Sequence, residues 1–459
     1  MPQTRFEPQV TNNPFTERLI AATEGSQPSV VSLQAASARV TSEQQHSQPR
    51  RLACLVTHGM GQQVPFETLA LVAEAFGRGE RKHTIEADRV ALMPDSDLQM
   101  CMRVCFEADE AKGLDAVEVE VFEAYWAPLT EGKISFVQSV GFLLQSGLRA
   151  LLCYFLPVKT REGKRMWGFN RWVFGDIRAF TTKPSTLLML VATMLLLLLI
   201  VLAGLGSPYA IRWLWEQVGH TSVRELLQHL WTKSTIYYGG LILLCWLIGY
   251  WVRYAIVEFG GDVVIYVSSF KVSAFQEIRD AIQKRATDIG KQIVQAQDPK
   301  RPGHHRFDGL IFVGHSLGSV ISYDLINALL VWDVRNGKPE HHMLKRMQRF
   351  ITFGSPLDKT AYLFRNQVKM DHHYREQMAG NMQPLILDYT FRTFPWVNLY
   401  TYRDVVSGKL AYYDWPVGGE TFPIRNVVDP QAWIPLIAHT QYWKNKMLTD
   451  ELLEAIKRR

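Results

Sequence analysis

The sequence is poor in features that would assign it to several common classes of protein. It has only five cysteines in 459 residues, scattered without the spacing of a disulfide framework or a zinc site. Its 50 basic residues exceed its 44 acidic ones by six, yet they form no basic stripe of the kind that binds nucleic acid. Residues 1–48 contain no apolar core segment, so we expect no secretory signal there. We therefore expect a protein of a reducing compartment, without a metal site and without a nucleic-acid partner.

The strongest motif follows residue 308. Residues 309–313 form a short apolar run typical of a buried strand, and a helical pattern begins after it. Residues 314–318 between them read Gly-His-Ser-Leu-Gly, which matches the G-x-S-x-G nucleophile elbow, a strained strand-to-helix turn that exposes a serine. Glycine is needed two residues before and after the serine because the backbone passes too close to its neighbours for a Cβ. Ser316 is the candidate nucleophile.

A second glycine turn follows an early apolar strand over residues 51–57. It reads His-Gly-Met-Gly, and in enzymes with a nucleophile elbow such a turn supplies a backbone N–H to the oxyanion hole. We expect the amides of Met60 and Leu317 to be the two donors, and the alternative is an ordinary strand-to-helix loop. The residues expected to border the substrate are His58, Gly59 and His315.

A serine hydroxyl needs a base to take its proton and an acid to orient that base. In this type of site the acid and then the histidine follow the serine along the chain. Asp404 stands just past an apolar strand that begins at Trp396 and is the candidate acid; Asp414 is the alternative, and Asp388 precedes the strand and fits less well. His439 is the only histidine after His373, so chain order selects it as the candidate base.

Two long runs without a charged residue, 185–205 and 234–252, lie in the middle of the chain. At 1.5 Å per residue the first would cover roughly the 30 Å hydrocarbon core of a bilayer, and aromatic residues flank the second as at a membrane interface. Residues 134–158 are also apolar but are interrupted by Arg149, which favours a helix at the membrane interface. The alternative for the two long runs is a pair of buried core helices.

The basic residues predict the orientation of these spans. Residues 159–183, before the first span, carry seven lysines and arginines, whereas residues 206–233, between the spans, carry three. Cytoplasmic segments next to membrane spans are enriched in basic residues. We therefore expect the connector outside, with both chain ends and the remaining domain in the cytoplasm.

The elbow, the His-Gly-Met-Gly turn and the late Asp404 and His439 resemble the α/β-hydrolase superfamily, and within it serine lipases and esterases. Three short stretches also look like those of DDHD-type intracellular phospholipases. They are Gly-His-Ser-Leu-Gly-Ser at 314–319, Phe-Gly-Ser-Pro-Leu at 353–357 and the Tyr-Trp after His439. The resemblance implies an α/β-hydrolase fold, with a mostly parallel sheet flanked by helices, here interrupted by an inserted transmembrane helical hairpin. It also implies acyl transfer to water through an acyl-serine, without a cofactor.

These observations predict four segments. Residues 1–50 form a disordered polar segment, 51–133 the first part of the hydrolase domain, 134–258 the membrane insertion and 259–459 the second part. We expect a membrane-anchored serine hydrolase that cleaves carboxylic esters, on the triad of Ser316, Asp404 and His439. Because the anchor places the site where acyl chains are concentrated, we expect a lipid or acyl-ester substrate. An acyltransferase or thioesterase with the same triad, or a non-catalytic membrane scaffold, are the alternatives.

Overall fold

The structure is a computed structural model. It describes most of the two predicted parts of the hydrolase domain and little of the segment between them. The described residues are 49–60, 63–94, 96–130, 158–159, 165–166, 266, 273–336, 343–357, 360, 392–404, 406–410, 424–433 and 438–457. The predicted polar segment before residue 49 and the predicted spans at 185–205 and 234–252 lie outside them. Within the predicted insertion, the structure describes one pair of two-residue strands, β5 (Val158–Lys159) and β6 (Arg165–Met166).

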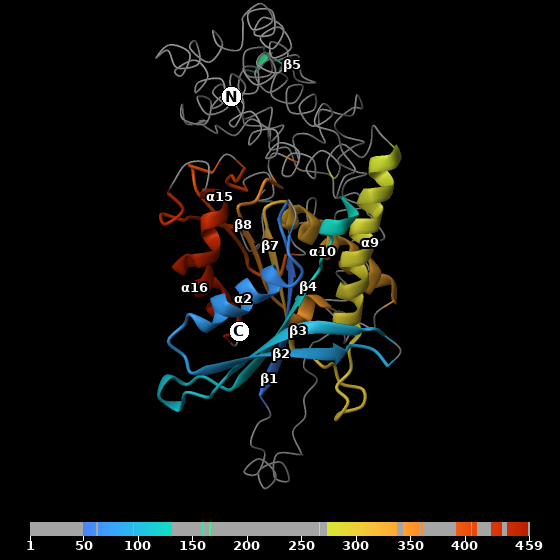
Figure 1. Cartoon of the computed structure of the whole chain (residues 1–459), viewed down its shortest axis with the longest axis vertical. Helices are drawn as coiled ribbons and strands as arrows, with labels where there is room; N and C mark the ends of the chain where they lie inside the picture. The colour runs from blue at the N-terminus through green and yellow to red at the C-terminus, as the bar shows by residue number, and fades with distance from the viewer. Residues whose placement is uncertain are drawn as a thin grey trace, which may run out of the picture.

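One eight-stranded sheet forms the centre of the fold, in the order β10-β9-β8-β7-β1-β4-β3-β2 (Figure 1). Its strands are β1 (Arg50–Thr57), β2 (His83–Ala91), β3 (Leu98–Phe106), β4 (Val117–Glu123), β7 (Gly309–His315), β8 (Met347–Phe353), β9 (Trp396–Tyr400) and β10 (Arg425–Val428). The neighbours from β10 to β4 are parallel, whereas β3 is antiparallel to both β4 and β2. The sheet is therefore mixed and mostly parallel, as predicted except for the antiparallel strands at one side.

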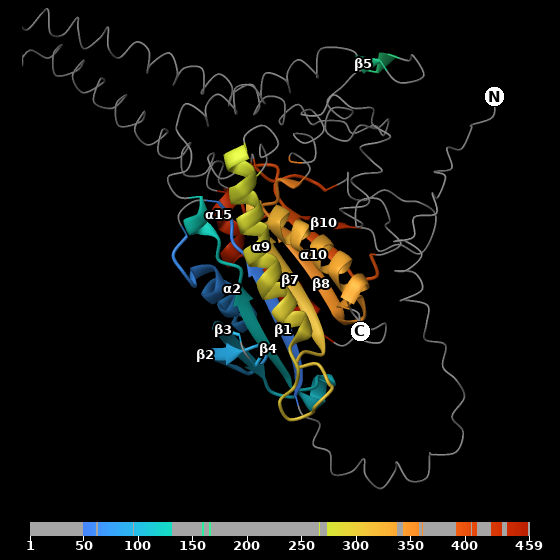
Figure 2. The same ribbon diagram turned by 90° about the vertical axis from the view of Figure 1, so that its right-hand side faces the viewer.

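Helices cover both faces of this sheet, as the α/β class requires. On one face α9 (Ser273–Gln295) packs against α10 (Leu317–Asn336), and α10 packs on β7 (Figure 2). On the other face α2 (Glu67–Gly77) packs against α16 (Lys446–Ala455). The short helical turns are η1 (Glu110–Lys112), η2 (Ala127–Leu129), α11 (Met343–Arg346), α15 (Ala438–Gln441) and η6 (Tyr442–Lys444). Two apolar cores result, one under each helical layer.

The central strands β1 and β7 are apolar along their length because side chains on both faces are covered by helices. The alternation of valine and glutamate in β4 is typical of a half-exposed strand, but the structure contradicts this expectation. β4 lies between β1 and β3 and is almost wholly buried. Its polar side chains are accommodated by pairing, as Glu120 shows with an ion pair to Arg306 at 2.7 Å.

Local sequence predicted the helices better than the edge of the sheet. The sequence predicts helices at 65–76, 274–295 and 446–457, and the structure confirms them as α2, α9 and α16, with small shifts of their ends. The hairpin of β2 and β3 was not predicted, because its first strand is rich in exposed polar residues and has little alternation. His439 lies in the short helix α15, a single helical turn within the connection that follows β10.

The carboxyl edge of the sheet, where the parallel strands end, is also where the predicted insertion joins the fold. The chain continues from β4 through η2, and the last described residue before the insertion is Thr130. It returns at Tyr266 and α9, which packs against η2 and whose Arg285 Nε donates to the Tyr125 carbonyl at 2.7 Å. The amino-terminal end of α9 extends beyond this edge (Figure 1). Both attachment points thus lie at the same edge of the sheet.

Candidate active site

Ser316 stands at the tip of the turn between β7 and α10. It has φ 53°, one of two positive values among the described non-glycine residues, so the serine is held in the left-handed region that L-residues rarely adopt. The Ser316 amide donates to the Phe353 carbonyl at 3.0 Å, at the end of the neighbouring strand β8. This is the strained strand-to-helix turn that the elbow motif predicted.

The two elbow glycines are required by close backbone approach. A Cβ on Gly314 would lie 2.5 Å from the Ser319 Cα, in the first turn of α10. A Cβ on Gly318 would lie 2.1 Å from the Thr57 carbonyl oxygen and 2.3 Å from that of His58. The start of α10 is therefore pressed against the end of β1, and this contact brings the His58 loop next to the serine.

His439 bridges Ser316 and Asp404. The Ser316 Oγ–H donates to His439 Nε2 at 2.8 Å, and His439 Nδ1–H donates to Asp404 Oδ2 at 2.9 Å. Since a carboxylate only accepts, Nδ1 carries the ring proton and Nε2 is left with a free lone pair toward the serine. The three residues come from the loops after β7, β9 and β10, more than 30 positions apart in every pair, and the structure brings all three together. Asp414, the alternative acid, lies outside the described residues.

Asp404 is buried and held on both carboxylate oxygens. Oδ1 accepts from the Val406 amide at 2.8 Å, and Oδ2 accepts from the Tyr442 hydroxyl at 3.1 Å besides His439. The same Tyr442 oxygen accepts from the Thr401 amide at 3.0 Å. Burial and the nearby carboxylate raise the pKa of Tyr442, which keeps its hydroxyl protonated as a donor. Sequence reasoning missed this residue; the one available signal was its place three residues after His439.

His315 packs beside the base instead of facing an open site. Its ring lies 4.9 Å from that of Phe353 and 5.0 Å from that of Trp443, between ring centres, and it is buried. His315 Nε2–H donates to the carbonyl of His439 at 3.1 Å. Burial, with the nearby His439, lowers the pKa of His315 to about 3, so the ring stays neutral. Its side chain therefore supports α15, and its contact with a substrate stays a prediction.

His58 is likewise enclosed. Its Nδ1–H donates to the Gly59 carbonyl at 2.9 Å, and its Nε2 accepts from the Trp126 amide at 3.0 Å. The ring stacks on that of Trp126 with centres 4.7 Å apart, and burial lowers its pKa to about 4. The side chain of His58 thus ties the turn after β1 to the turn after β4, and its contact with a substrate stays a prediction.

Gly59 brings the turn into contact with the elbow. A Cβ at Gly59 would lie 2.9 Å from the Ser316 Cβ and 2.9 Å from His315 Nδ1. Met60 follows directly, with its side chain buried. Leu317 is the first residue of α10, and the first amides of a helix have no partner within it and carry partial positive charge. The backbones of both predicted oxyanion donors therefore lie next to the serine.

Among the described residues, no three His, Cys, Asp or Glu side chains are grouped as metal ligands would be. One described helix is long and apolar enough to cross a membrane, the stretch Leu317–Arg335 of α10. It is mostly buried against the sheet and α9, as a core helix of an α/β protein is. No protein family, characterised protein or solved structure matches the chain significantly.

Proposed function

We propose that this chain is a membrane-anchored serine hydrolase of the α/β-hydrolase type, which cleaves carboxylic esters of lipids or other acyl compounds. One observation carries the proposal. The hydroxyl of a serine held at φ 53° lies 2.8 Å from a histidine whose other nitrogen lies 2.9 Å from a buried aspartate. Nucleophile, base and orienting acid meet in hydrogen-bond contact, in the chain order that the resemblance implies.

The geometry supports a two-step acyl transfer. Ser316 Oγ attacks the ester carbonyl carbon while its proton passes to His439 Nε2, and the imidazolium is stabilised by Asp404. The carbonyl oxygen becomes an oxyanion, for which the amides of Met60 and Leu317 are the proposed donors, each worth roughly 3 kcal/mol of transition-state stabilisation. His439 then protonates the leaving alkoxide, leaving an acyl-serine. A water molecule, deprotonated by His439, hydrolyses that ester and restores the enzyme.

The lipid part of the proposal rests on where the site lies. The triad stands at the carboxyl edge of the sheet, and the segment with the two uncharged runs is attached at that edge through η2 and Tyr266. A hairpin formed by those runs would hold the active site close to a bilayer, where acyl chains are concentrated. The basic residues at 159–183 favour the cytoplasmic leaflet.

The test is labelling with a fluorophosphonate, which reacts with an activated serine without requiring knowledge of the substrate. The full chain is labelled in detergent and in liposomes, beside Ser316→Ala and His439→Ala. We expect wild type to be labelled, Ser316→Ala to be unlabelled, and His439→Ala to react at least 100-fold more slowly because the base is lost. Labelling of Ser316→Ala at the wild-type rate would refute the assignment of the nucleophile.

The substrate class requires a second assay. A panel of lipid esters, acyl-thioesters and alcohol acceptors is offered to wild type, with product analysis. Release of free fatty acid from oxygen esters supports a hydrolase, whereas transfer to an alcohol or preference for a thioester indicates one of the related acyl-transfer reactions. Absence of labelling in both detergent and liposomes would favour a non-catalytic scaffold.

A further inference from the structure

The large apolar side chains that the described part of the molecule exposes are not spread over its surface. There are six of them: Val64, Phe66, Leu98, Tyr402, Val428 and Trp433. Val64 and Phe66 lie between β1 and α2, Tyr402 follows β9, and the last two end or follow β10. Leu98 begins β3, which is antiparallel, so it too belongs to the carboxyl edge. All six therefore lie at the edge that holds the triad, although β1 and β4 separate the strand of Leu98 from β7, which leads to Ser316.

Four of these residues flank the triad from two sides. On one side, Val64 and Phe66 follow the turn whose Gly59 contacts Ser316. On the other, Tyr402 lies two residues before Asp404. Trp433 is held next to Tyr402, because the Arg403 guanidinium donates to the Trp433 carbonyl at 2.9 Å. We name Val64, Phe66, Tyr402 and Trp433 the apolar rim.

Phe66 shows that this exposure is imposed by the fold. It is 49% exposed and has φ 70°, a left-handed conformation that is strained for a bulky residue. The conformation is held from inside the domain, where the buried carboxylate of Glu123 accepts from the Phe66 amide at 3.1 Å. The phenyl ring of Phe66 is therefore exposed at the start of α2, although burying this ring would have added stability to the fold.

The place where the predicted insertion joins the fold indicates what this surface binds. Both attachment points of the insertion, after η2 and before α9, lie at the same edge, and the insertion contains the two uncharged runs and seven basic residues at 159–183. A tether at that edge keeps the rim at a high effective concentration next to any bilayer that the runs enter. Tryptophan and tyrosine favour the membrane interface, and the exposed cation Arg403 among them suits an anionic leaflet.

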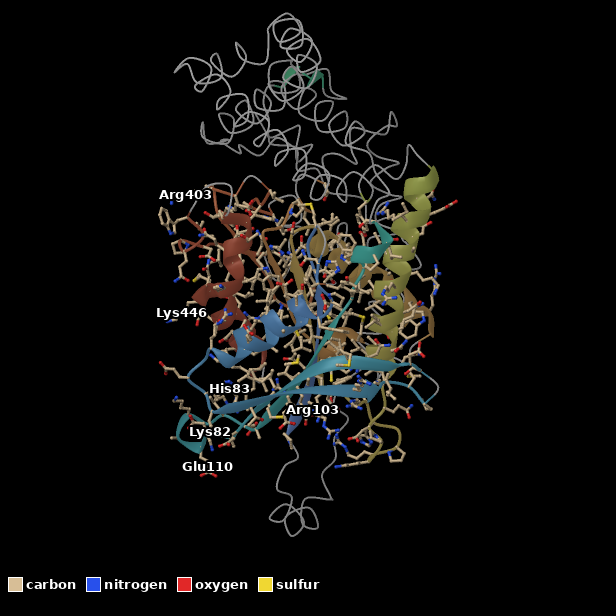
Figure 3. The ribbon with its side chains drawn as sticks, viewed as in Figure 1. Lys82, His83, Arg103, Glu110, Arg403 and Lys446 are labelled. Atoms are coloured by element: carbon tan, nitrogen blue, oxygen red, sulfur yellow. The ribbon has the colours of Figure 1, made fainter. Side chains whose placement is uncertain are left out.

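We infer that the apolar rim docks on the surface of a phospholipid bilayer, so that the triad opens toward the lipid and an acyl chain reaches Ser316 without crossing water. This inference rests on the proposed membrane attachment and deepens the proposed hydrolase by naming its lipid-facing surface. Arg403 stands at one end of the molecule and Lys82 and Glu110 at the other, where no rim residue lies (Figure 3).

A test without catalysis places a fluorescent amino acid at position 66 or 433 of the full chain, with position 82 as the control. Lys82 is exposed and lies at the amino edge. The protein is reconstituted in phosphatidylcholine–phosphatidylglycerol liposomes that contain nitroxide-labelled lipid. We expect the probes at 66 and 433 to be quenched at least threefold more strongly than the probe at 82. Equal quenching at all three positions, or quenching at none, would overturn the docking surface.

A catalytic test separates docking from chemistry. Phe66→Ser with Trp433→Ser is compared with Leu98→Ser, an exposed apolar residue of the same edge outside the rim. For each variant, turnover of a vesicle-embedded ester is divided by turnover of a soluble short-chain ester. We expect this ratio to fall about tenfold in the double variant and to stay at the wild-type value in Leu98→Ser. An unchanged ratio in the double variant contradicts the inference.

The two proposals fail in different ways. If wild type turns over neither ester and is not labelled by fluorophosphonate, the hydrolase is refuted, while the nitroxide quenching still reports docking. If wild type is active but the probes at 66 and 433 are quenched no more strongly than the probe at 82, docking on lipid is refuted while the hydrolase stands.

Discussion

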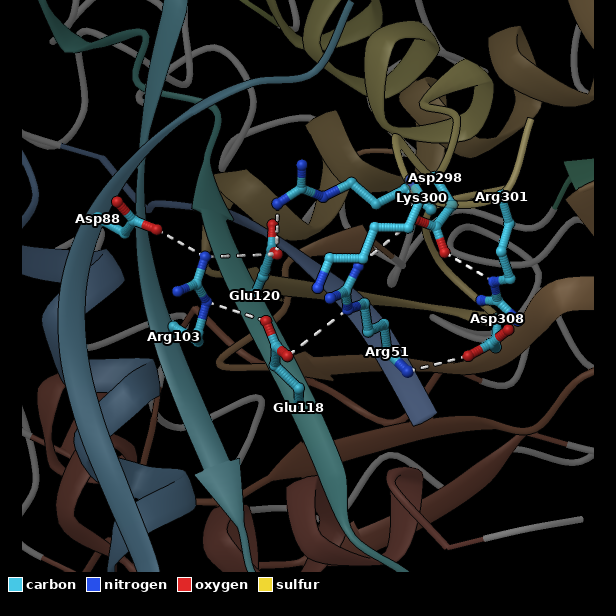
Figure 4. Close-up of polar contacts among 10 residues, drawn as sticks. Arg51, Asp88, Arg103, Glu118, Glu120, Asp298, Lys300, Arg301 and Asp308 are labelled. Carbon is cyan, nitrogen blue, oxygen red and sulfur yellow. Dashed lines mark hydrogen bonds and ion pairs between the residues drawn. The ribbon is translucent and has the colours of Figure 1, made fainter. Parts of the chain in front are cut away.

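At the carboxyl edge of the sheet, the loops after β7, β9 and β10 bring Ser316, Asp404 and His439 together, and apolar side chains are left exposed around them. At the amino end, strands and loops are joined by alternating arginines and carboxylates (Figure 4). Arg103 pairs with Asp88 at 2.6 Å and with Glu118 at 2.9 Å. One end of the sheet thus holds strain and exposed apolar side chains, and the other holds paired arginines and carboxylates.

The difference indicates that the two edges of this sheet have different roles. Backbone strain at Ser316 and Phe66 costs free energy, and it persists only where the surrounding structure enforces it. The amino-end network adds cross-links between β1, β3, β4 and the loop before β7 without adding reactive groups. We expect changes at the carboxyl edge to alter chemistry and changes at the amino end to alter stability, and four predictions test this contrast.

The largest effect is expected for Gly318→Ala. Its Cβ would lie 2.1 Å from the Thr57 carbonyl oxygen, and backbone atoms there cannot move away cheaply. We expect a loss of about 3 kcal/mol in the free energy of unfolding by pulse proteolysis and a fall of more than 100-fold in fluorophosphonate labelling. Gly408→Ala is the control, since no atom lies within 4 Å of its Cβ. Normal labelling of Gly318→Ala would show that the close approach of α10 to β1 is unnecessary.

At the amino end, Arg306→Met should separate stability from chemistry. The substitution leaves the buried Glu120 carboxylate without its partner at 2.7 Å and with Arg103 at 3.9 Å. Removing one member of a buried pair costs about 3 kcal/mol, and we expect that loss in pulse proteolysis with an unchanged labelling rate per folded molecule. Adding Glu120→Gln should recover most of the stability. A loss of labelling without a loss of stability would contradict the division between the two edges.

Glu123→Gln tests the buried carboxylate that accepts a hydrogen bond from the Phe66 amide of the apolar rim. The readout is the pH dependence of the free energy of unfolding. Burial raises the pKa of Glu123 from 4.5 to about 7, so the folded protein keeps a proton that the unfolded chain releases between those values. The stability from this group is therefore full below pH 4.5 and is lost as pH rises through 7. Since glutamine does not titrate, we expect the variant to gain about 2 kcal/mol relative to wild type between pH 5 and pH 8. Parallel stability curves would exclude titration of Glu123 in this range.

The smallest effect is expected for Tyr442→Phe, which removes one donor from Asp404. A hydrogen bond to a charged group is worth about 1.5 kcal/mol, so kcat on a soluble ester should fall about tenfold with little change in KM. Tyr400→Phe is the control, because that hydroxyl bonds Tyr402 and not the triad. An unchanged kcat in Tyr442→Phe, or an equal fall in Tyr400→Phe, would reduce Tyr442 to a structural residue.

How far the sequence predicted the site depends on whether the signal was local. The elbow was predictable because its glycines, its serine and the flanking strand and helix all lie within one short stretch of about 15 residues. The order of acid and base selected Asp404 and His439, which the structure brings to the serine. The roles of His58 and His315 were not predictable, because each ring is enclosed by residues distant in the chain, such as Trp126 and Phe353.

By itself, the sequence determined the α/β class, the main helices, the elbow turn and the existence of two long uncharged runs, since each depends on periodicity or on residue types a few positions apart. Only the tertiary structure decided that β4 is buried, that β2 and β3 add an antiparallel side, and that Tyr442 holds Asp404. It alone also decided that the exposed apolar residues gather at the edge where the chain leaves the sheet after Thr130 and returns at Tyr266. These features arise from contacts between segments tens to hundreds of residues apart, and local patterns do not encode such contacts.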